Sequence, residues 1–142
     1  MDTVNKEILK SIDLFNGLTT SELEKISLIS ELTKVVEGEE FMQRGKEASS
    51  FFIVLSGSYM VEFKNGQAFT LHSRGDILGW SSIISPHFYK GSGVALTDGE
   101  LAEIKGSKFR KLIEEDTNFG KKIMTKLDKI VQERMPFVKG TE

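Results

Sequence analysis

Residues 75–96 read GDILGWSSIISPHFYKGSGVAL, and this stretch holds the residue types that could bind a small ligand. The run 79–82 has small side chains and hydroxyls, so its backbone N–H groups could bind an anion at the start of a short helix. Aromatic bulk follows, but Lys90 is the only cation of the stretch. The candidate pocket residues are Gly79, Trp80, Ser81, Ser82, Phe88, Tyr89 and Lys90.

The three aromatic residues of this segment allow two interpretations. Large aromatic side chains usually pack in a core, so Trp80, Phe88 and Tyr89 could fill the pocket completely. Alternatively, they could line a cavity for a flat or apolar ligand, with a few polar groups that orient it. The sequence leaves both interpretations open.

The sequence gives little indication of metal binding or of catalysis. The chain has no cysteine, which excludes disulfides, thiol catalysis and cysteine metal sites. His72 and His87 lie on different segments and lack the spacing of a metal site. No nucleophile-elbow motif surrounds the serines. We therefore expect no metal, no cofactor and no enzymatic activity.

Length and composition indicate one globular domain. The chain has 142 residues, of which 39% are hydrophobic and 28% charged. Its net charge of -2 gives no basic field for nucleic acid. The apolar runs are too short to span a membrane, and the N-terminus lacks a signal-peptide core. We expect a cytoplasmic protein with no direct nucleic-acid or membrane partner.

Apolar periodicity divides the chain into four parts. A helical lead-in covers residues 1–32, with one helix over 3–15 and a second that starts at a capping box of Thr19 and Glu22. Residues 33–104 show short apolar runs broken by glycine, which predicts an antiparallel β-roll. C-terminal helices follow over 105–135, and a tail over 136–142.

One hairpin is expected at Asn65-Gly66, because both residues tolerate a positive φ. A two-residue loop would place Phe69 opposite Glu62. A longer loop pairs Phe63 with Phe69, which favours contact between two aromatic rings. We therefore predict the longer loop.

The C-terminal part predicts two helices. Ser107 is the expected N-cap of the first, and Asp116 caps a longer helix that Pro136 ends. In the longer helix Gly120, Ile123, Leu127, Ile130 and Arg134 recur at three- and four-residue steps. This apolar stripe either packs on the roll or extends beyond it to a second subunit. We favour the homodimer, with Ile123, Leu127 and Ile130 as its contact residues.

The order of these segments resembles the cyclic nucleotide-binding domain of catabolite activator proteins and of cyclic-nucleotide-dependent kinase regulatory subunits. The resemblance covers about residues 13–134 and includes LFNGLTTSELEKI, VVEGEEFMQRGKEASSFFIVLSGSYMVEF, RGDILGW and TDGELAEIKGSKFRKLIEED. Its most specific feature is the glycine series Gly38, Gly45, Gly57, Gly75 and Gly79 between short apolar strands. The resemblance implies a β-roll of jelly-roll type, with N-terminal helices and a long C-terminal helix.

In that family a Gly-Glu-x-Ala-Leu cassette followed by an arginine binds the ligand. The glutamate accepts a hydrogen bond from the ribose, and the arginine pairs with the cyclic phosphate. Alignment from Gly75-Asp76 puts Gly79 on the cassette glycine, Trp80 on the glutamate, Ser82 on the alanine and Ile83 on the leucine. The acid is therefore absent from this chain.

The phosphate-binding arginine is absent as well. Counting back from Thr97-Asp98 puts Tyr89 on the arginine, or Phe88 if the loop shifts by one residue. Lys90 is adjacent, but neighbouring side chains of a strand point to opposite faces, so Lys90 should point away from the pocket. Losing two charge-assisted hydrogen bonds removes roughly 3–6 kcal/mol of binding free energy.

These observations predict a regulatory or ligand-sensing module that is weak or inactive toward cyclic AMP and cyclic GMP. Its ligand would be a small aromatic or anionic molecule. The chain should lack a DNA-binding domain of its own, because only FVKGTE follows Pro136. Three alternatives stay open: a dimeric scaffold with a filled pocket, the sensor fragment of a Crp/Fnr-type transcription regulator, and a module that acts on a protein partner.

Overall fold

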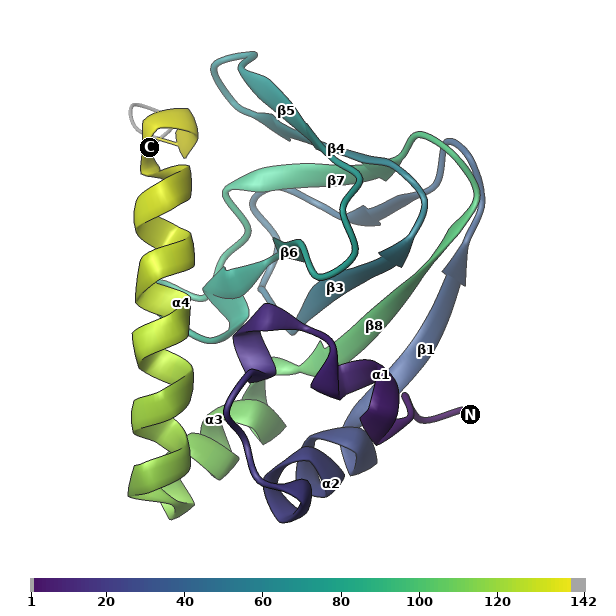
Figure 1. Ribbon diagram of the computed structural model, residues 1–142. Helices are drawn as coiled ribbons and strands as arrows, with labels where there is room; N and C mark the ends of the chain where they lie inside the picture. Colours follow the sequence, from purple (N-terminus) through teal and green to yellow (C-terminus); the bar gives the residue numbers. More distant parts are fainter. Residues whose placement is uncertain (1, 139–142) are drawn as a thin grey trace.

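Two four-stranded antiparallel sheets form the centre of the molecule (Figure 1). The computed structural model describes residues 2–138 and the side chains of residues 2–134. The sheets have the strand orders β1-β8-β3-β6 and β2-β7-β4-β5, which confirms the predicted β-roll. The strands are β1 Ser30–Val35, β2 Glu40–Met42, β3 Ser50–Ser56, β4 Tyr59–Phe63, β5 Ala68–Leu71, β6 Ile77–Leu78, β7 Gly91–Ala95 and β8 Gly99–Lys105.

Strand β3 connects two apolar cores. Because successive side chains of a strand point to opposite faces, Phe51 and Ile53 pack in the core beneath the helices, whereas Phe52 and Val54 pack between the sheets. All four side chains are buried, which explains the continuous apolar run of this strand. The roll therefore has one inner core and one core shared with the helices.

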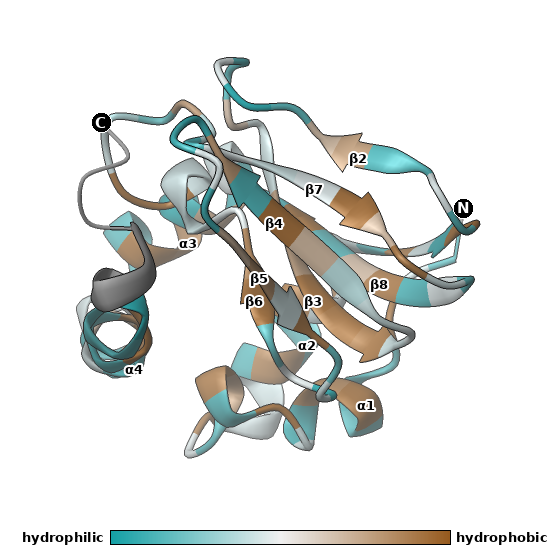
Figure 2. Cartoon of the chain, turned by 90° about the horizontal axis from the view of Figure 1, so that it is seen from above, coloured by the Kyte–Doolittle hydropathy of each residue, from teal (hydrophilic) through white to brown (hydrophobic). Residues whose placement is uncertain are grey.

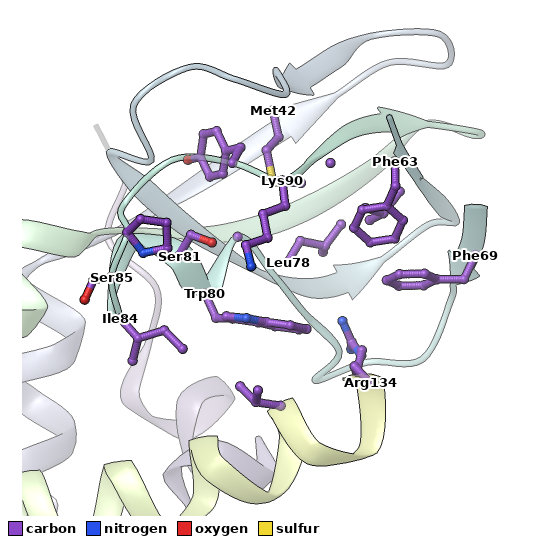
Figure 3. Close-up of a pocket in the computed structure, with 16 residues that line it drawn as sticks. Met42, Phe63, Phe69, Leu78, Trp80, Ser81, Ile84, Ser85, Lys90 and Arg134 are labelled. Carbon is purple, nitrogen blue, oxygen red and sulfur yellow. The ribbon is translucent and has the colours of Figure 1, made fainter. Parts of the chain in front are cut away.

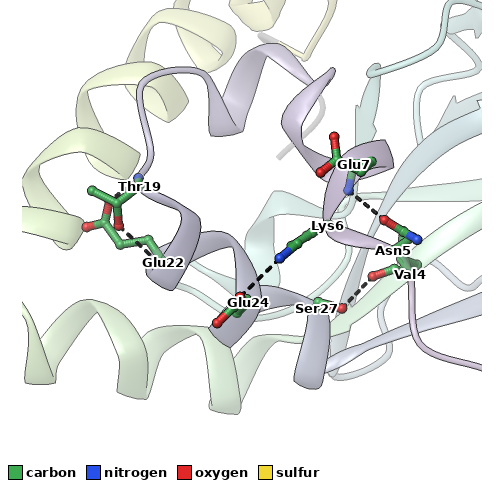
Figure 4. Close-up of polar contacts among 8 residues, drawn as sticks. All are labelled: Val4, Asn5, Lys6, Glu7, Thr19, Glu22, Glu24 and Ser27. Atoms are coloured by element: carbon green, nitrogen blue, oxygen red, sulfur yellow. Dashed lines mark hydrogen bonds and ion pairs between the residues drawn. The ribbon is translucent and has the colours of Figure 1, made fainter.

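The N-terminal segment forms α1 (Lys6–Lys10), the short 3₁₀ helix η1 (Asp13–Phe15) and α2 (Thr20–Leu28). The single helix that we predicted over residues 3–15 is wrong, because an extended Ile12 separates α1 from η1. The capping box is confirmed: the Thr19 hydroxyl accepts from the Glu22 amide, and the Glu22 carboxylate accepts from the Thr19 amide (Figure 4). This pair fixes the start of α2.

The hairpin between β4 and β5 has a different register from the predicted one. Val61 lies opposite Phe69, and the Phe63 amide donates to the Gln67 carbonyl at 2.8 Å. Phe63 and Phe69 are therefore not cross-strand partners. Their rings still meet, with centroids 5.6 Å apart, because the two residues lie diagonally on one face of the sheet.

Helices α3 (Gly106–Glu115) and α4 (Thr117–Val138) complete the chain. The Asp116 carboxylate accepts from the Phe119 amide at 3.1 Å, as predicted for a cap of α4. Ser107 does not cap α3, because that helix begins at Gly106. Helix α4 also continues through Pro136 to Val138, so the prediction that Pro136 ends it is wrong.

The apolar stripe of α4 packs against its own chain. Ile123 and Leu127 are 0% and 1% exposed and belong to the core beneath the helices, and Ile130 packs against that core. Ile123 and Leu127 are therefore unavailable for the dimer contact that we predicted, because they are already buried within the chain. Ile130 is only partly buried, so its assignment stays a prediction. The opposite face of α4 carries exposed polar residues: Lys121, Thr125, Asp128, Lys129 and Gln132.

Helix α4 stands beside the roll, as the view along its axis shows (Figure 2). It is linked at its beginning to the N-terminal helices, because the Lys122 amine lies 2.9 Å from the Glu22 carboxylate. Within residues 2–138, no helix combines the length and the apolar character that crossing a membrane requires.

Candidate ligand-binding site

A cavity of about 190 Å³ lies between the roll and α4 (Figure 3). Strands of both sheets, the loop after η2 (Trp80–Ser82) and the distal half of α4 contribute to its wall. The wall is mostly apolar and aromatic. The lining residues are Met42, Val61, Phe63, Phe69, Leu78, Gly79, Trp80, Ser81, Ile84, Ser85, Pro86, Tyr89, Lys90, Gly91, Val131 and Arg134.

Gly79 makes the sharp turn that brings Trp80 to the cavity. Its φ of 80° is a left-handed conformation, which glycine adopts without strain. A Cβ at this position would lie 3.1 Å from both the Ser50 carbonyl oxygen and the Tyr89 ring. The glycine is therefore required by conformation and by the close approach of β3.

Trp80 forms one wall of the cavity, and Arg134 of α4 lies against it. The central guanidinium carbon of Arg134 is 5.4 Å from the centroid of the Trp80 ring and 5.5 Å from that of Phe69. The guanidinium also donates to the Ile77 carbonyl oxygen at 2.5 Å. Burial lowers the pKa of Arg134, while the carboxylates of Asp76 and Glu133 oppose that shift.

Arg134 was not among the predicted pocket residues. It lies in α4, more than fifty residues beyond Trp80, so no local motif joins the two. A signal was nevertheless present, because Arg134 continues the apolar stripe of α4. A cation in line with buried apolar residues indicates a partly buried charge that needs aromatic or carbonyl partners.

Tyr89 is fixed in the inner core, with one edge of its ring on the cavity. Its hydroxyl donates to the Ser50 carbonyl oxygen at 2.5 Å and accepts from the Ser50 amide at 3.2 Å. Burial is the largest influence on its phenol and raises the pKa. Tyr89 therefore acts as a packing residue that closes the inner end of the cavity.

Lys90 extends into the cavity, with its amine directed toward Trp80 (Figure 3). Our expectation that it points away is wrong for a local reason. Lys90 precedes β7, and Tyr89 pairs with the turn at residues 45–46 through two backbone hydrogen bonds. The alternation of side chains between the two faces of a strand therefore applies only from Gly91 onward. Tyr89 and Lys90 precede it, so these two neighbours can both line the cavity.

Two of the predicted pocket residues do not line the cavity. Phe88 is 54% exposed, and Ser82 is fully buried on the side of α3. The Ser82 hydroxyl has no hydrogen-bond partner among the described residues. The Ser82 amide donates to the Gly79 carbonyl oxygen at 3.1 Å, so it is not free to bind an anion.

Neither histidine takes part in a metal site. The Nδ1 atom of His87 lies 2.8 Å from the Ser81 carbonyl oxygen and supports the loop beside the cavity. His72 is exposed. Over the part of the chain that the structure describes, no cluster of three His, Asp or Glu side chains could hold a metal ion.

Comparison with known proteins finds a relative in sequence. The chain is 28% identical over 109 residues to a cAMP-dependent protein kinase regulatory subunit of Colletotrichum orbiculare. That match includes 76% of this chain but only 28% of the relative. The chain thus spans little more than a quarter of the length of that regulatory subunit.

Solved structures share the fold over nearly the whole chain. A Geobacter metallireducens protein, assigned to the cyclic nucleotide-binding proteins, matches with a TM-score of 0.83 and 25% identity over 93% of this chain and 98% of that one. The regulatory subunit of a cAMP-independent protein kinase A from Trypanosoma brucei matches with a TM-score of 0.74 and 19% identity. That match covers 89% of this chain and 45% of the other.

The family model for the cyclic nucleotide-binding domain matches residues 32–116, from the third residue of β1 to the cap of α4. This region includes the glycine series, the turn at Gly79 and most of the cavity wall. The chain therefore belongs to the cyclic nucleotide-binding domain family.

Proposed function

We propose that this chain is a ligand-sensing regulatory module whose cavity does not bind cyclic AMP or cyclic GMP tightly. One observation carries the proposal: the guanidinium of Arg134 is stacked on the Trp80 indole, at the position that corresponds to the ribose-binding glutamate of the family. An indole cannot accept a hydrogen bond from a ribose hydroxyl, because its only polar group is an N–H donor.

The volume of the cavity supports the same proposal. Pockets for drug-sized ligands enclose roughly 300–1,000 Å³, whereas this cavity has about 190 Å³. A base, a sugar and a cyclic phosphate would together need more space than that. The fold also occurs in a Trypanosoma brucei kinase regulatory subunit that is described as cAMP-independent.

A scaffold with a filled pocket is the second candidate, and Tyr89 favours it. Its phenol is buried, and its hydroxyl both donates to the Ser50 carbonyl oxygen and accepts from the Ser50 amide, as expected for a residue of a packed core. The remaining cavity and its two cations favour the sensing function instead. A homodimer stays a prediction without an assigned surface, and so does a protein partner that responds to α4.

Direct titration tests the proposed function. Trp80 is the only tryptophan of the chain, so its emission reports on the cavity alone. We expect cyclic AMP and cyclic GMP to change neither this emission nor the melting temperature below high micromolar concentration. Saturable binding of either nucleotide with a Kd below about 1 µM, equal to roughly -8.2 kcal/mol, would contradict the proposal.

A metabolite screen by thermal shift separates the two candidates. A ligand of the folded state raises the melting temperature by mass action, by an amount that grows with its concentration. A saturable shift accompanied by a change in Trp80 emission supports a sensor. The complete absence of shifts from small molecules would support the scaffold.

A further inference from the structure

The outer face of the sheet β2-β7-β4-β5 is not covered by helices. Its inner face packs on the other sheet through residues such as Tyr59 and Val61. In Figure 1 α1, α2 and α3 lie on the opposite side of the roll, and no helix crosses in front of these strands in Figure 2. The sheet β1-β8-β3-β6, in contrast, packs on both faces. We call the uncovered surface the open face.

Apolar side chains lie in the middle of the open face. Met60 is directly opposite Val94, so their Cβ atoms are roughly 4.5–5.5 Å apart. Because side chains alternate along a strand, Leu96 points to the same side as Val94, and it is 39% exposed. The Leu96 amide donates to the Ser58 carbonyl oxygen at 2.8 Å, which holds Leu96 beside β4. Outward positions of a half-covered sheet are usually polar, so these three apolar residues form an uncommon cluster.

The charges beside this cluster are acidic. Glu40 lies opposite Val94, and Glu62 is the next outward residue after Met60. Both glutamates are exposed. Among the described residues of the four strands, no outward position holds a lysine or an arginine. The open face therefore combines an apolar centre with a negative rim.

Hydrogen bonds between two turns fix the end of the open face. The Asp98 carboxylate accepts from the Glu37 amide at 2.8 Å, and the Gly38 amide donates to the Ala95 carbonyl oxygen at 2.7 Å. The turn after β1 and the turn after β7 are thereby held together. A surface that is ordered in advance loses little conformational entropy when a partner binds.

A second copy of this chain does not complement the open face. Two open faces in contact would bring the glutamates of both copies together, which opposes association. The exposed side of α4 carries polar residues, as described above, so it has no apolar groups to cover Val94 and Leu96. Charge complementarity instead favours a partner that carries aliphatic and basic side chains.

The backbone of the open face favours a helical partner. The strand ladders already pair the backbone groups of the central strands β7 and β4, so this face offers side chains only. A partner must therefore satisfy its own backbone groups, as a helix does.

We infer that the open face docks a basic amphipathic helix of a partner protein, with aliphatic side chains on Met60, Val94 and Leu96 and basic side chains near Glu40 and Glu62. None of these five residues lines the cavity. The inference therefore goes beyond the proposed function and does not depend on it. It gives the module a surface through which it contacts another protein.

A basic amphipathic peptide tests the inference. The probe is an acetylated and amidated peptide of three Leu-Lys-Lys-Leu repeats, and calorimetry measures its binding. We expect a Kd below about 100 µM. Versions with glutamate for lysine, or with serine for leucine, should bind at least about tenfold more weakly. Trp80 emission should stay unchanged, because the indole lines the cavity and not the open face.

Apolar variants locate the peptide. Val94→Thr and Leu96→Ser should each weaken binding by about three- to tenfold, since each removes apolar contact area. Leu28→Ser is the matched control, because Leu28 is 78% exposed but belongs to α2 on the other side of the roll. That variant should bind the peptide as the wild type does.

A charge variant tests the acidic rim. Glu62→Gln keeps the shape of the side chain and should weaken binding by about two- to fivefold, with a smaller effect of added salt. Glu114→Gln is the control, because Glu114 is an exposed glutamate of α3. Circular dichroism melts check folding, and the exposed Glu62 position keeps the test valid if Val94→Thr unfolds.

Several results would overturn the inference. These are no binding of the basic peptide at 1 mM, equal binding of the acidic version, or an equal loss in the Leu28→Ser control. A change of Trp80 emission at saturation would place the peptide at the cavity instead. A wild-type dimer that Leu96→Ser dissociates, measured by light scattering, would assign the open face to a second copy. Each failure leaves the proposed function standing, because titration with cyclic nucleotides tests that function separately.

Discussion

The guanidinium of Arg134 lies over the indole ring of Trp80, with its central carbon 5.4 Å from the ring centroid. Trp80 belongs to the turn after β6, and Arg134 to the distal half of α4. The pair thus joins the turn at Gly79 to the C-terminal helix. A change in the cavity that displaces one of these side chains would therefore alter its contact with the other.

Replacing Arg134 by Ala should lower the free energy of unfolding by about 1–3 kcal/mol. The variant loses two cation–π contacts and a charged hydrogen bond to the Ile77 carbonyl oxygen. Denaturant unfolding measures this loss, and Trp80 emission should shift in the folded state. Lys129→Ala on the exposed face of the same helix should change stability by less than about 0.5 kcal/mol. An equal effect of both substitutions would show that the stack is not stabilising.

Restoring the two nucleotide anchors should create measurable binding of cyclic AMP. Both side chains line the cavity, but the Tyr89 hydroxyl is bonded to Ser50 in the core, so the double variant to make is Trp80→Glu with Lys90→Arg. The new carboxylate adds one charge-assisted hydrogen bond, and the arginine replaces a cation that already lines the cavity, so the gain is roughly 1.5–3 kcal/mol, or about 10–10² in affinity. Calorimetry measures the gain.

The control for this double variant is Trp80→Glu with Tyr89→Arg. Tyr89 is buried against Ser50, so an arginine there should disrupt the core without reaching the ligand. We therefore expect a lower melting temperature and no binding from the control. Recovery of binding only in the control would show that Tyr89 occupies the phosphate position after all.

Ser82→Ala should raise the free energy of unfolding by about 1 kcal/mol, since a buried hydroxyl without a partner carries an uncompensated desolvation cost. Ser50→Ala is the matched comparison, because the Ser50 hydroxyl is also buried but donates to the Glu103 carboxylate at 2.8 Å. That variant should lose about 1 kcal/mol. Guanidinium unfolding curves measure both changes, and a destabilising Ser82→Ala would show that this hydroxyl does have a partner.

The Glu22–Lys122 contact should make stability depend on pH in the acidic range. Burial alone would raise the pKa of Glu22, but hydrogen bonds from Thr19 and Lys122 outweigh it and lower the pKa below 4.5. The folded state thus favours the ionised carboxylate. Its contribution is complete above the unfolded value and is lost as the pH falls through the lower folded value.

A comparison of wild type with Glu22→Gln checks this sign. At pH 7 the variant should be less stable by about 1–2 kcal/mol, because a charged hydrogen bond to Lys122 is weakened. The difference should shrink as the pH falls below 4.5. Glu24→Gln is the control, since the Glu24 contact with Lys6 is exposed. A difference that grew at acidic pH would contradict the assignment.

Features that depend on local sequence could be predicted. The capping box of Thr19 and Glu22 needs only residues three apart, and its geometry is confirmed. Gly57 and Gly75 were expected at tight turns, and both have positive φ, at 94° and 98°. In each case the backbone conformation restricts the residue type directly.

Features that depend on distant segments could not be predicted. The contact between Phe69 and Arg134 joins β5 to α4, and it is not visible in the turn sequence. The orientation of Lys90 depends on pairing between Tyr89 and residues 45–46. Arg134 joins the cavity only because α4 folds back along the sheets.

Two polar contacts of α4 lie far apart along the helix axis, so a tilt of the helix would affect them unequally. The helix is fastened near its beginning by Lys122 to Glu22 and twelve residues later by Arg134 to the Ile77 carbonyl oxygen. These points are about 18 Å apart along the axis. A tilt of about 10° around the first point would move the second by about 3 Å, as far as a hydrogen bond is long. The Arg134 contact would break completely under that tilt while the Glu22 contact stayed closed, so the contact beside Trp80 is the one that a tilt of α4 opens first.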